Sequence, residues 1–153
     1  MRRGQQKRIR AFTVSQRSYH LIGGYNFRTD QVFSQAVESK DSQTFIQFLE
    51  YLLVECFPTQ KIVLVMDNAS YHRSKTVLAA LSLFEPRVRV FWLPKYCPTL
   101  NLIERFWRHL KDLACANKLD QSLENLAERV RVILECQNSS DDVLRMSFLK
   151  NYV

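Results

Sequence analysis

Residues 61–68 read KIVLVMDN, an unbroken apolar run that ends in a carboxylate. A strand without polar residues is typical of a parallel sheet that is covered by helices on both faces. In such sheets, ligands bind beyond the carboxyl ends of the strands. Asp67 takes that position directly after the run, so it is the first candidate for a functional side chain.

The segments on either side of this strand predict an α/β order. Downstream, the spacing of apolar residues predicts a helix over residues 74–84, a strand over 88–92 and a helix over 101–116. Upstream, a helix that Asp41 or Ser42 caps is predicted to extend to Cys56 and to cover the sheet. Strands that alternate with helices pair in parallel, so a parallel pair is expected at the centre.

The two ends of the chain carry weaker patterns. Residues 8–15 and 19–27 alternate around a short polar break and predict an antiparallel hairpin, to which residues 32–37 add a short strand. Near the other end, a second amphipathic helix is predicted over 122–136 and a short one near 141–149. No repeat or linker divides the sequence, so we expect one compact domain.

The composition favours a nucleic-acid partner. The chain has 153 residues, of which 46% are hydrophobic, enough to bury one core of ordinary size. Its 22 Lys and Arg residues outnumber its 15 Asp and Glu residues, and a net charge of +7 favours polyanions. The sequence holds neither a membrane-spanning stretch nor the apolar segment of a secretion signal, which predicts a cytoplasmic protein whose cysteines are reduced.

A second carboxylate lies on the helix predicted over 101–116. At about 100° per residue, the apolar side chains of that helix form one arc. Glu104 falls at the border of the arc, where it can reach toward Asp67. Two convergent carboxylates suit Mg²⁺, which takes oxygen ligands and completes its shell with water and phosphate. Metals held this way activate the attacking oxygen and stabilise the leaving oxygen in phosphodiester cleavage.

Each carboxylate also has an ordinary structural explanation. Glu104 can form a surface ion pair with Arg108, one helical turn further on, worth only about 0.2–0.5 kcal/mol. Asp67 can close its strand with an Asx turn or cap the next helix. On spacing alone, these alternatives stay open.

The residues that flank the two carboxylates carry a resemblance. DNASYHRS at positions 67–74 and LPKYCPTLNLIERFW at positions 93–107 resemble the DDE transposases of bacterial insertion sequences related to mariner. The similarity runs from near residue 4 to about residue 115. It implies an α/β, ribonuclease H-like fold with a mixed sheet flanked by helices. It also implies that Asp67 and Glu104 are the family's second and third catalytic acids and metal ligands, with Mg²⁺ or Mn²⁺ as the cofactor.

The same resemblance implies roles for other residues. His72 is expected to support the two acids by approaching phosphate or the water shell of the metal. Tyr96 and Pro98 are expected to shape the loop that delivers Glu104, since proline fixes its own φ. The implied process is hydrolysis and strand transfer in DNA transposition, carried out by a homo-oligomer. The cations expected along the DNA path are Lys95, Arg105, Arg108 and Lys111.

The sequence departs from the family in two places. In the family, the first catalytic Asp lies on a strand, and a helix-turn-helix region binds the transposon ends. Both the strand and this region would precede residue 1. Asp30, in a polar turn, and Asp41, a helix cap, do not replace that acid. Residues 1–153 are therefore expected to form a partial catalytic domain that lacks the first central strand and is inactive alone. An upstream transposase polypeptide, or a longer frameshifted product, would complete it.

Two other functions stay open. A non-catalytic remnant would bind nucleic acid with the same basic surface and without holding a metal. A different ribonuclease H-like nuclease, acting on RNA or on a DNA junction, would use the same metal chemistry. Because salt weakens nucleic-acid binding in every case, metal dependence separates a catalytic domain from a remnant better than salt dependence does.

Overall fold

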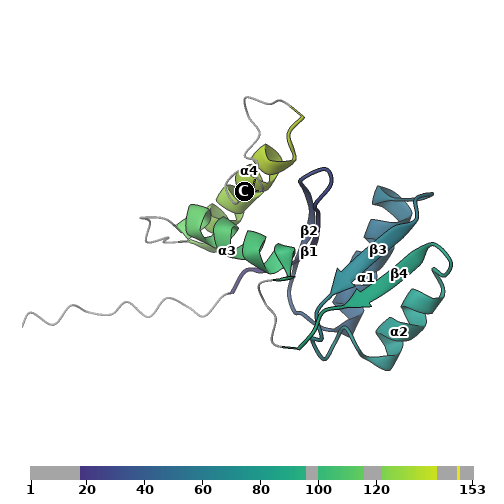
Figure 1. Ribbon diagram of the computed structural model, residues 1–153. Helices are drawn as coiled ribbons and strands as arrows, with labels where there is room; N and C mark the ends of the chain where they lie inside the picture. Colours follow the sequence, from purple (N-terminus) through teal and green to yellow (C-terminus); the bar gives the residue numbers. More distant parts are fainter. Residues whose placement is uncertain (1–17, 96–99, 116–121, 141–147, 149–153) are drawn as a thin grey trace, which may run out of the picture.

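The structure, a computed structural model, describes residues 18–95, 100–115, 122–140 and 148 (Figure 1). These residues form two small sheets, four α-helices and one π-helical turn. In chain order the elements are β1 (His20–Asn26), β2 (Gln31–Val37), α1 (Ser42–Glu50), η1 (Tyr51–Cys56), β3 (Ile62–Met66), α2 (Lys75–Ser82), β4 (Val88–Trp92), α3 (Leu102–Cys115) and α4 (Leu123–Asn138).

β1 and β2 form an antiparallel hairpin in which Gly23 lies opposite Ser34. The strand predicted over residues 19–27 is thus confirmed, as is the short strand over residues 32–37. The predicted partner of the first strand, residues 8–15, lies outside the described residues. In the structure, β2 takes the place beside β1.

β3 and β4 form the expected parallel pair, with Ile62 opposite Val88. One face of this pair packs on α1 and α2. On the other face, the side chains of three residues are 58%, 55% and 60% exposed, namely Val63, Val65 and Phe91. The expectation that the apolar run is buried on both faces is therefore wrong in the described structure, because helices cover only one side of this pair.

Polar side chains fix where the helices begin. Asp41 accepts hydrogen bonds from the backbone N–H groups of Gln43 and Thr44 and caps α1, as predicted. Ser74 and Ser122 cap α2 and α4 in the same way. The helix predicted to run on to Cys56 does so, but its last part is the π-helical turn η1.

Asp30 is a structural residue of the β1–β2 turn. Its φ is 56°, and its carboxylate accepts a hydrogen bond from the hydroxyl of Tyr25. Its backbone oxygen accepts a second hydrogen bond from the side chain of Gln137 on α4. Asp30 therefore links the hairpin to α4 by hydrogen bonds. This structural role agrees with the prediction that Asp30 is not a catalytic acid.

Apolar side chains form two clusters on opposite sides of β1. Ile22 belongs to the cluster around Leu53, which α1, α2 and the β3–β4 pair share. Leu21 and Tyr25 pack on the cluster around Phe106, which α3 and α4 share. Since alternate residues of a strand point to opposite faces, β1 joins the two clusters. Figure 1 accordingly shows the hairpin between the α3–α4 pair and the β3–β4 sheet.

Gly23 allows α3 to pack closely on β1. A Cβ atom at this position would lie 2.6 Å from the carbonyl oxygen of Phe33 and 2.9 Å from the ring of Trp107. We expect Gly23→Ala to lower the free energy of unfolding by about 1–3 kcal/mol, as overpacking does. Gly24→Ala is the matched control, because its Cβ would meet Phe48 only at 3.8 Å. Equal thermal unfolding midpoints for the two variants would contradict this account.

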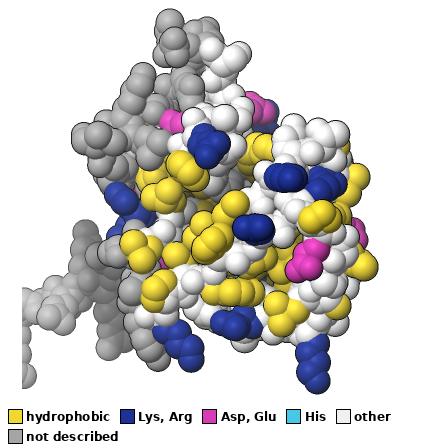
Figure 2. Space-filling view, turned by 45° about the vertical axis from the view of Figure 1, so that its right-hand side comes forward, with side chains coloured by type: hydrophobic (Ala, Val, Ile, Leu, Met, Phe, Trp, Pro, Cys, Tyr) yellow, Lys and Arg dark blue, Asp and Glu magenta, His cyan; other side chains and the backbone are white. Residues whose placement is uncertain are grey.

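Apolar side chains also reach the surface. Figure 2 shows them in the middle of one face of the molecule, with Lys and Arg side chains around them.

No described helix is both long and apolar enough to cross a membrane. Tyr96, Pro98 and nearly all of the short helix expected near 141–149 lie outside the described residues.

Candidate active site

Asp67 directly follows β3, at the carboxyl end of the parallel pair, as predicted. Its Oδ1 accepts a hydrogen bond from the backbone N–H of Ala69 at 3.0 Å and lies 2.7 Å from Nδ1 of His72. The first contact is the Asx turn that the ordinary explanation of this residue predicts. Oδ2 has one long contact to a described side chain, the amide of Asn101 at 3.5 Å. Oδ2 is therefore the oxygen that Asp67 can offer to a ligand.

His72 is placed to orient Asp67. Its ring centroid lies 4.3 Å from that of Phe45 and 4.2 Å from that of Tyr71. The His72 side chain is only 13% exposed, against 34% for Asp67. Because the packed ring directs Nδ1 at Oδ1, it restricts rotation of the Asp67 carboxylate. Its supporting role in a reaction stays a prediction.

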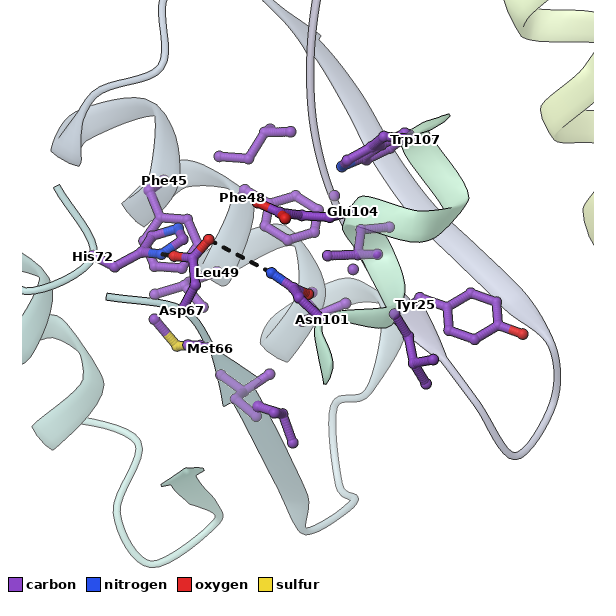
Figure 3. Close-up of a pocket in the computed structure, with 18 of the residues that line it drawn as sticks. Tyr25, Phe45, Phe48, Leu49, Met66, Asp67, His72, Asn101, Glu104 and Trp107 are labelled. Carbon is purple, nitrogen blue, oxygen red and sulfur yellow. Dashed lines mark hydrogen bonds and ion pairs between the residues drawn. The ribbon is translucent and has the colours of Figure 1, made fainter. Parts of the chain in front are cut away.

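Glu104 lies in the first turn of α3, where the helix dipole favours a negative side chain. The residue is exposed, and within the described structure it makes no ion pair with Arg108. The described structure therefore does not support the explanation of Glu104 as a member of a surface ion pair. Figure 3 shows its carboxylate directed into the pocket that Asp67 also lines.

Asp67 and Glu104 both line one cavity of about 470 Å³. Residues of β1, α1, the end of β3 and the start of α3 line it. Burial raises the pKa of the Tyr71 hydroxyl at this cavity, and the negative charges of Asp67 and Glu104 raise it further. Both acids therefore lie near enough to this phenol to raise its pKa.

The donor chemistry of this pair fits a hard divalent cation. Oδ2 of Asp67 and the carboxylate of Glu104 offer oxygen atoms at one cavity, and Mg²⁺ and Mn²⁺ prefer oxygen ligands. Within the described ranges, no three His, Cys, Asp or Glu side chains converge as a metal site. The pair would therefore supply part of a coordination shell, with the remaining positions taken by water, phosphate or a further acid.

The four cations predicted along a DNA path occupy different positions. Arg108 and Lys111 follow Glu104 by four and seven residues, so they share its face of α3, and both are exposed. Arg105 is partly buried, and Lys95 is exposed soon after the end of β4. None of the four lines the cavity. Their contact with DNA stays a prediction.

Two residues at the cavity had no role in the sequence-based interpretation. Asn101 is 8% exposed and donates from Nδ2 to Oδ2 of Asp67. Tyr71 packs against His72 and lines the same cavity. Both residues belong to the two motifs, and Asn101 precedes Glu104 by three positions. That proximity to the acids is the signal from which their roles could have been predicted.

An aspartate at a strand end and a glutamate on a helix, at one cavity of an α/β domain, fit the ribonuclease H-like class of folds. The structure is similar to a chain in the cryo-EM structure of the simian T-cell lymphotropic virus intasome in complex with PP2A regulatory subunit B56 gamma. The TM-score is 0.61, and the match covers 88% of this chain and 49% of that chain. At 17% sequence identity this likeness shows the fold alone. The predicted ribonuclease H-like fold class is confirmed.

The chain belongs to the DDE superfamily endonucleases, whose family model matches residues 1–127. It is 34% identical over 134 residues to the insertion element IS630 uncharacterized 39 kDa protein of Shigella sonnei. That match covers 87% of this chain and 38% of the relative, so the chain spans well under half of the relative's length. The resemblance to the DDE transposases of insertion sequences is thereby confirmed.

Proposed function

We propose that this chain forms the catalytic part of a DNA transposase, which hydrolyses and transfers phosphodiesters with Mg²⁺ or Mn²⁺. The observation that carries the proposal is the cavity that Asp67 and Glu104 both line. These two carboxylates would hold the metal. A divalent ion held there would activate the attacking oxygen and stabilise the leaving one.

The surrounding residues prepare Asp67 for this role. The Ala69 N–H and His72 both contact Oδ1, which leaves Oδ2 with the long contact to Asn101. Asn101 approaches Oδ2 from the start of α3, the helix that carries Glu104 (Figure 3). The carboxylate is therefore held in one orientation before any ligand binds, which lowers the entropy cost of binding.

A third acid would come from outside the described residues. Two carboxylates line the cavity, and the family's first acid has no counterpart among the described aspartates. We propose that an upstream transposase polypeptide supplies it, that paired subunits form the active assembly, and that the 153-residue chain is inactive alone. Robust Mg²⁺-dependent DNA cleavage by the purified chain would contradict the last point.

A Mn²⁺ titration tests the proposed metal site. Asp67→Asn and Glu104→Gln each remove one ligand charge, so each is expected to weaken Mn²⁺ binding by at least about tenfold. Glu85→Gln is the matched control, because Glu85 is an exposed acid that does not line the cavity. Isothermal titration calorimetry provides the affinities. Equal affinities for the wild type and all three variants would refute the metal site.

The exposed cations of α3 are expected to bind DNA phosphates. Arg108→Ala and Lys111→Ala should each reduce the slope of log affinity against log salt concentration by about one. Lys75→Ala serves as the control, since this exposed lysine begins α2 and lies outside the cavity. Fluorescence anisotropy with a labelled duplex at several salt concentrations measures the slopes. Unchanged slopes in the α3 variants would place the DNA path elsewhere.

A non-catalytic DNA-binding remnant is the alternative function. It is favoured by the absence, within the described ranges, of a third metal-binding side chain beside the two acids. The remnant would bind DNA with the same salt dependence but would bind Mn²⁺ no better than its Asp67→Asn variant. The titration therefore separates the two functions, and DNA binding alone does not.

A further inference from the structure

The loop between β3 and α2 holds an exposed arginine close in sequence to the candidate active site. Arg73 directly follows His72, and the N–H groups of His72 and Arg73 donate to the carbonyl of Ala69 at 3.0 and 3.3 Å. His72 contacts Asp67, whereas Nη1 of Arg73 donates to Oδ1 of Asn68 at 2.6 Å. One turn therefore holds two neighbouring side chains, of which one orients Asp67 and the other contacts the residue after it.

Two contacts fix the position of the Arg73 guanidinium. Its Cζ lies 4.6 Å from the centroid of the ring of Trp92, the last residue of β4, well inside the range of a cation–π contact. Its second partner, Asn68, is itself held, because Nδ2 of Asn68 donates to the carbonyl of Leu93. The ends of β3 and β4 thus hold the planar group of an exposed side chain in one place.

The positive charge of Arg73 is not neutralised by these contacts. Its partners are an amide and an aromatic ring, and within the described ranges no carboxylate pairs with it. Arg131, which is also exposed, differs because it forms ion pairs with Glu128 and Glu135. Arg87 differs as well, since its Nη2 donates to two backbone carbonyls near the end of η1. Arg73 therefore keeps both its charge and its Nε and Nη2 donors for a ligand.

A fixed guanidinium without a carboxylate partner suits a phosphate group. Its planar donors match the oxygens of phosphate, and little rotational freedom remains to be lost on binding. The face of the Trp92 ring that Arg73 covers cannot stack on a base at the same time. The part of a nucleic acid that fits this place is therefore its phosphate backbone.

We propose that Arg73 binds a phosphate of the DNA backbone beside the cavity that Asp67 and Glu104 line, with Trp92 and Asn68 as its positioning residues. The inference rests on the proposed function, which supplies DNA as the ligand. Arg73 does not line the cavity, so it is a binding residue and not a catalytic one. It adds a DNA contact at the ends of β3 and β4 to the contacts proposed for the cations of α3.

The salt dependence of DNA binding tests the contact. Arg73→Met removes the charge and keeps an unbranched stem that can pack on Trp92. We expect it to reduce the slope of log affinity against log salt concentration by about one, for duplexes of any sequence. Lys75→Ala is the matched control, because this exposed cation lies two residues further on and should leave the slope unchanged. Fluorescence anisotropy of the full chain with a labelled duplex, without divalent ions, measures slopes that do not depend on the metal site.

A second variant tests the positioning role of the ring. Trp92→Leu leaves the charge of Arg73 in place and removes the group over which the guanidinium lies. The slope should stay near that of the wild type, while the affinity falls by about two- to tenfold, because the freed side chain must be ordered on binding. If Trp92→Leu does not fold, Asn68→Ala removes the other contact and provides the same test. Wild-type affinity in the folded variant would overturn the positioning role.

The outcomes separate this contact from a purely structural role and from the proposed function. A lower slope in Arg73→Met together with an unchanged slope in Lys75→Ala supports the proposal. It is overturned if Arg73→Met keeps the wild-type slope, even where urea denaturation shows a loss of stability, or if Lys75→Ala lowers the slope equally.

The Mn²⁺ titration judges the metal site independently, and Arg73→Met should bind Mn²⁺ as the wild type does. A lower slope in a chain that binds no Mn²⁺ would leave the Arg73 contact standing and refute the proposed metal site. A wild-type chain that binds no duplex would refute both the contact and the proposed function.

Discussion

Asp67→Asn is expected to lower metal-dependent DNA cleavage by at least about a hundredfold, in the active assembly that the proposed function requires. The substitution keeps the size of the side chain and the acceptor that Ala69 and His72 contact. It removes the negative charge that Oδ2 would present to the metal, so binding of DNA should survive. Cleavage of a labelled duplex in Mg²⁺ and in Mn²⁺ measures the effect.

Two observations would limit or reverse this interpretation. Glu85→Gln, an exposed acid away from the cavity, should cleave as the wild type does. If Asp67→Asn also cleaves at the wild-type rate, Asp67 serves only as the Asx-turn residue of its strand. If the Asp67→Asn variant loses DNA affinity together with cleavage, the negative charge of Asp67 contributes to folding or to DNA binding and not to metal binding.

Phe106→Ala is expected to be the most destabilising substitution in α3. Phe106 is 1% exposed, stacks on Tyr25 at 6.2 Å and meets the edge of Phe148 at 5.5 Å. Truncation of a buried phenylalanine removes about 3–5 kcal/mol from the free energy of unfolding, partly through the cavity that it leaves. This is a large share of the about 5–15 kcal/mol that stabilises a typical domain. Urea denaturation measures the loss.

Leu113→Ala is the matched control on the same helix. Leu113 is 37% exposed, so its truncation should cost much less, within about 1 kcal/mol. Because the Phe106 cluster anchors α3 to β1, Phe106→Ala should also weaken Mn²⁺ binding by displacing Glu104. Equal losses of stability in the two variants would show that the cluster does not anchor the helix.

Periodicity predicted the elements that depend on local sequence. The strand over 88–92 has the predicted bounds, and the helix caps Asp41, Ser74 and Ser122 are found where polar residues precede apolar spacing. These features follow from a few neighbouring residues, and no distant contact can easily override a cap. The same is true of Asp67, whose place at the end of β3 follows from the run before it.

Burial of the apolar run was mispredicted because it depends on what lies beside the strand. Val63 and Val65 have the composition of residues in a covered central strand, yet they are more than half exposed. An apolar run predicts a strand that is covered on both faces, whereas in the described structure helices cover only one face of the β3–β4 pair. The pattern of residues predicts that a strand is covered without identifying the element that covers it.

The place of both acids at one cavity was only partly predictable. Helical spacing placed Glu104 at the border of the apolar face, but the loop between β4 and α3 decides where that helix begins in space. The side chain of Asn101 and the ring of His72 then orient Asp67, through contacts that residue spacing does not encode. The motif resemblance, not periodicity, brought the two acids into one hypothesis.

The most direct test of the proposed metal site is a crystal of the chain grown with Mn²⁺ and measured near the manganese absorption edge. The account predicts an anomalous peak in the cavity, within bonding distance of Oδ2 of Asp67 and of the Glu104 carboxylate, that disappears in Asp67→Asn. A peak elsewhere, or a cavity without manganese in the wild-type crystals, would contradict it.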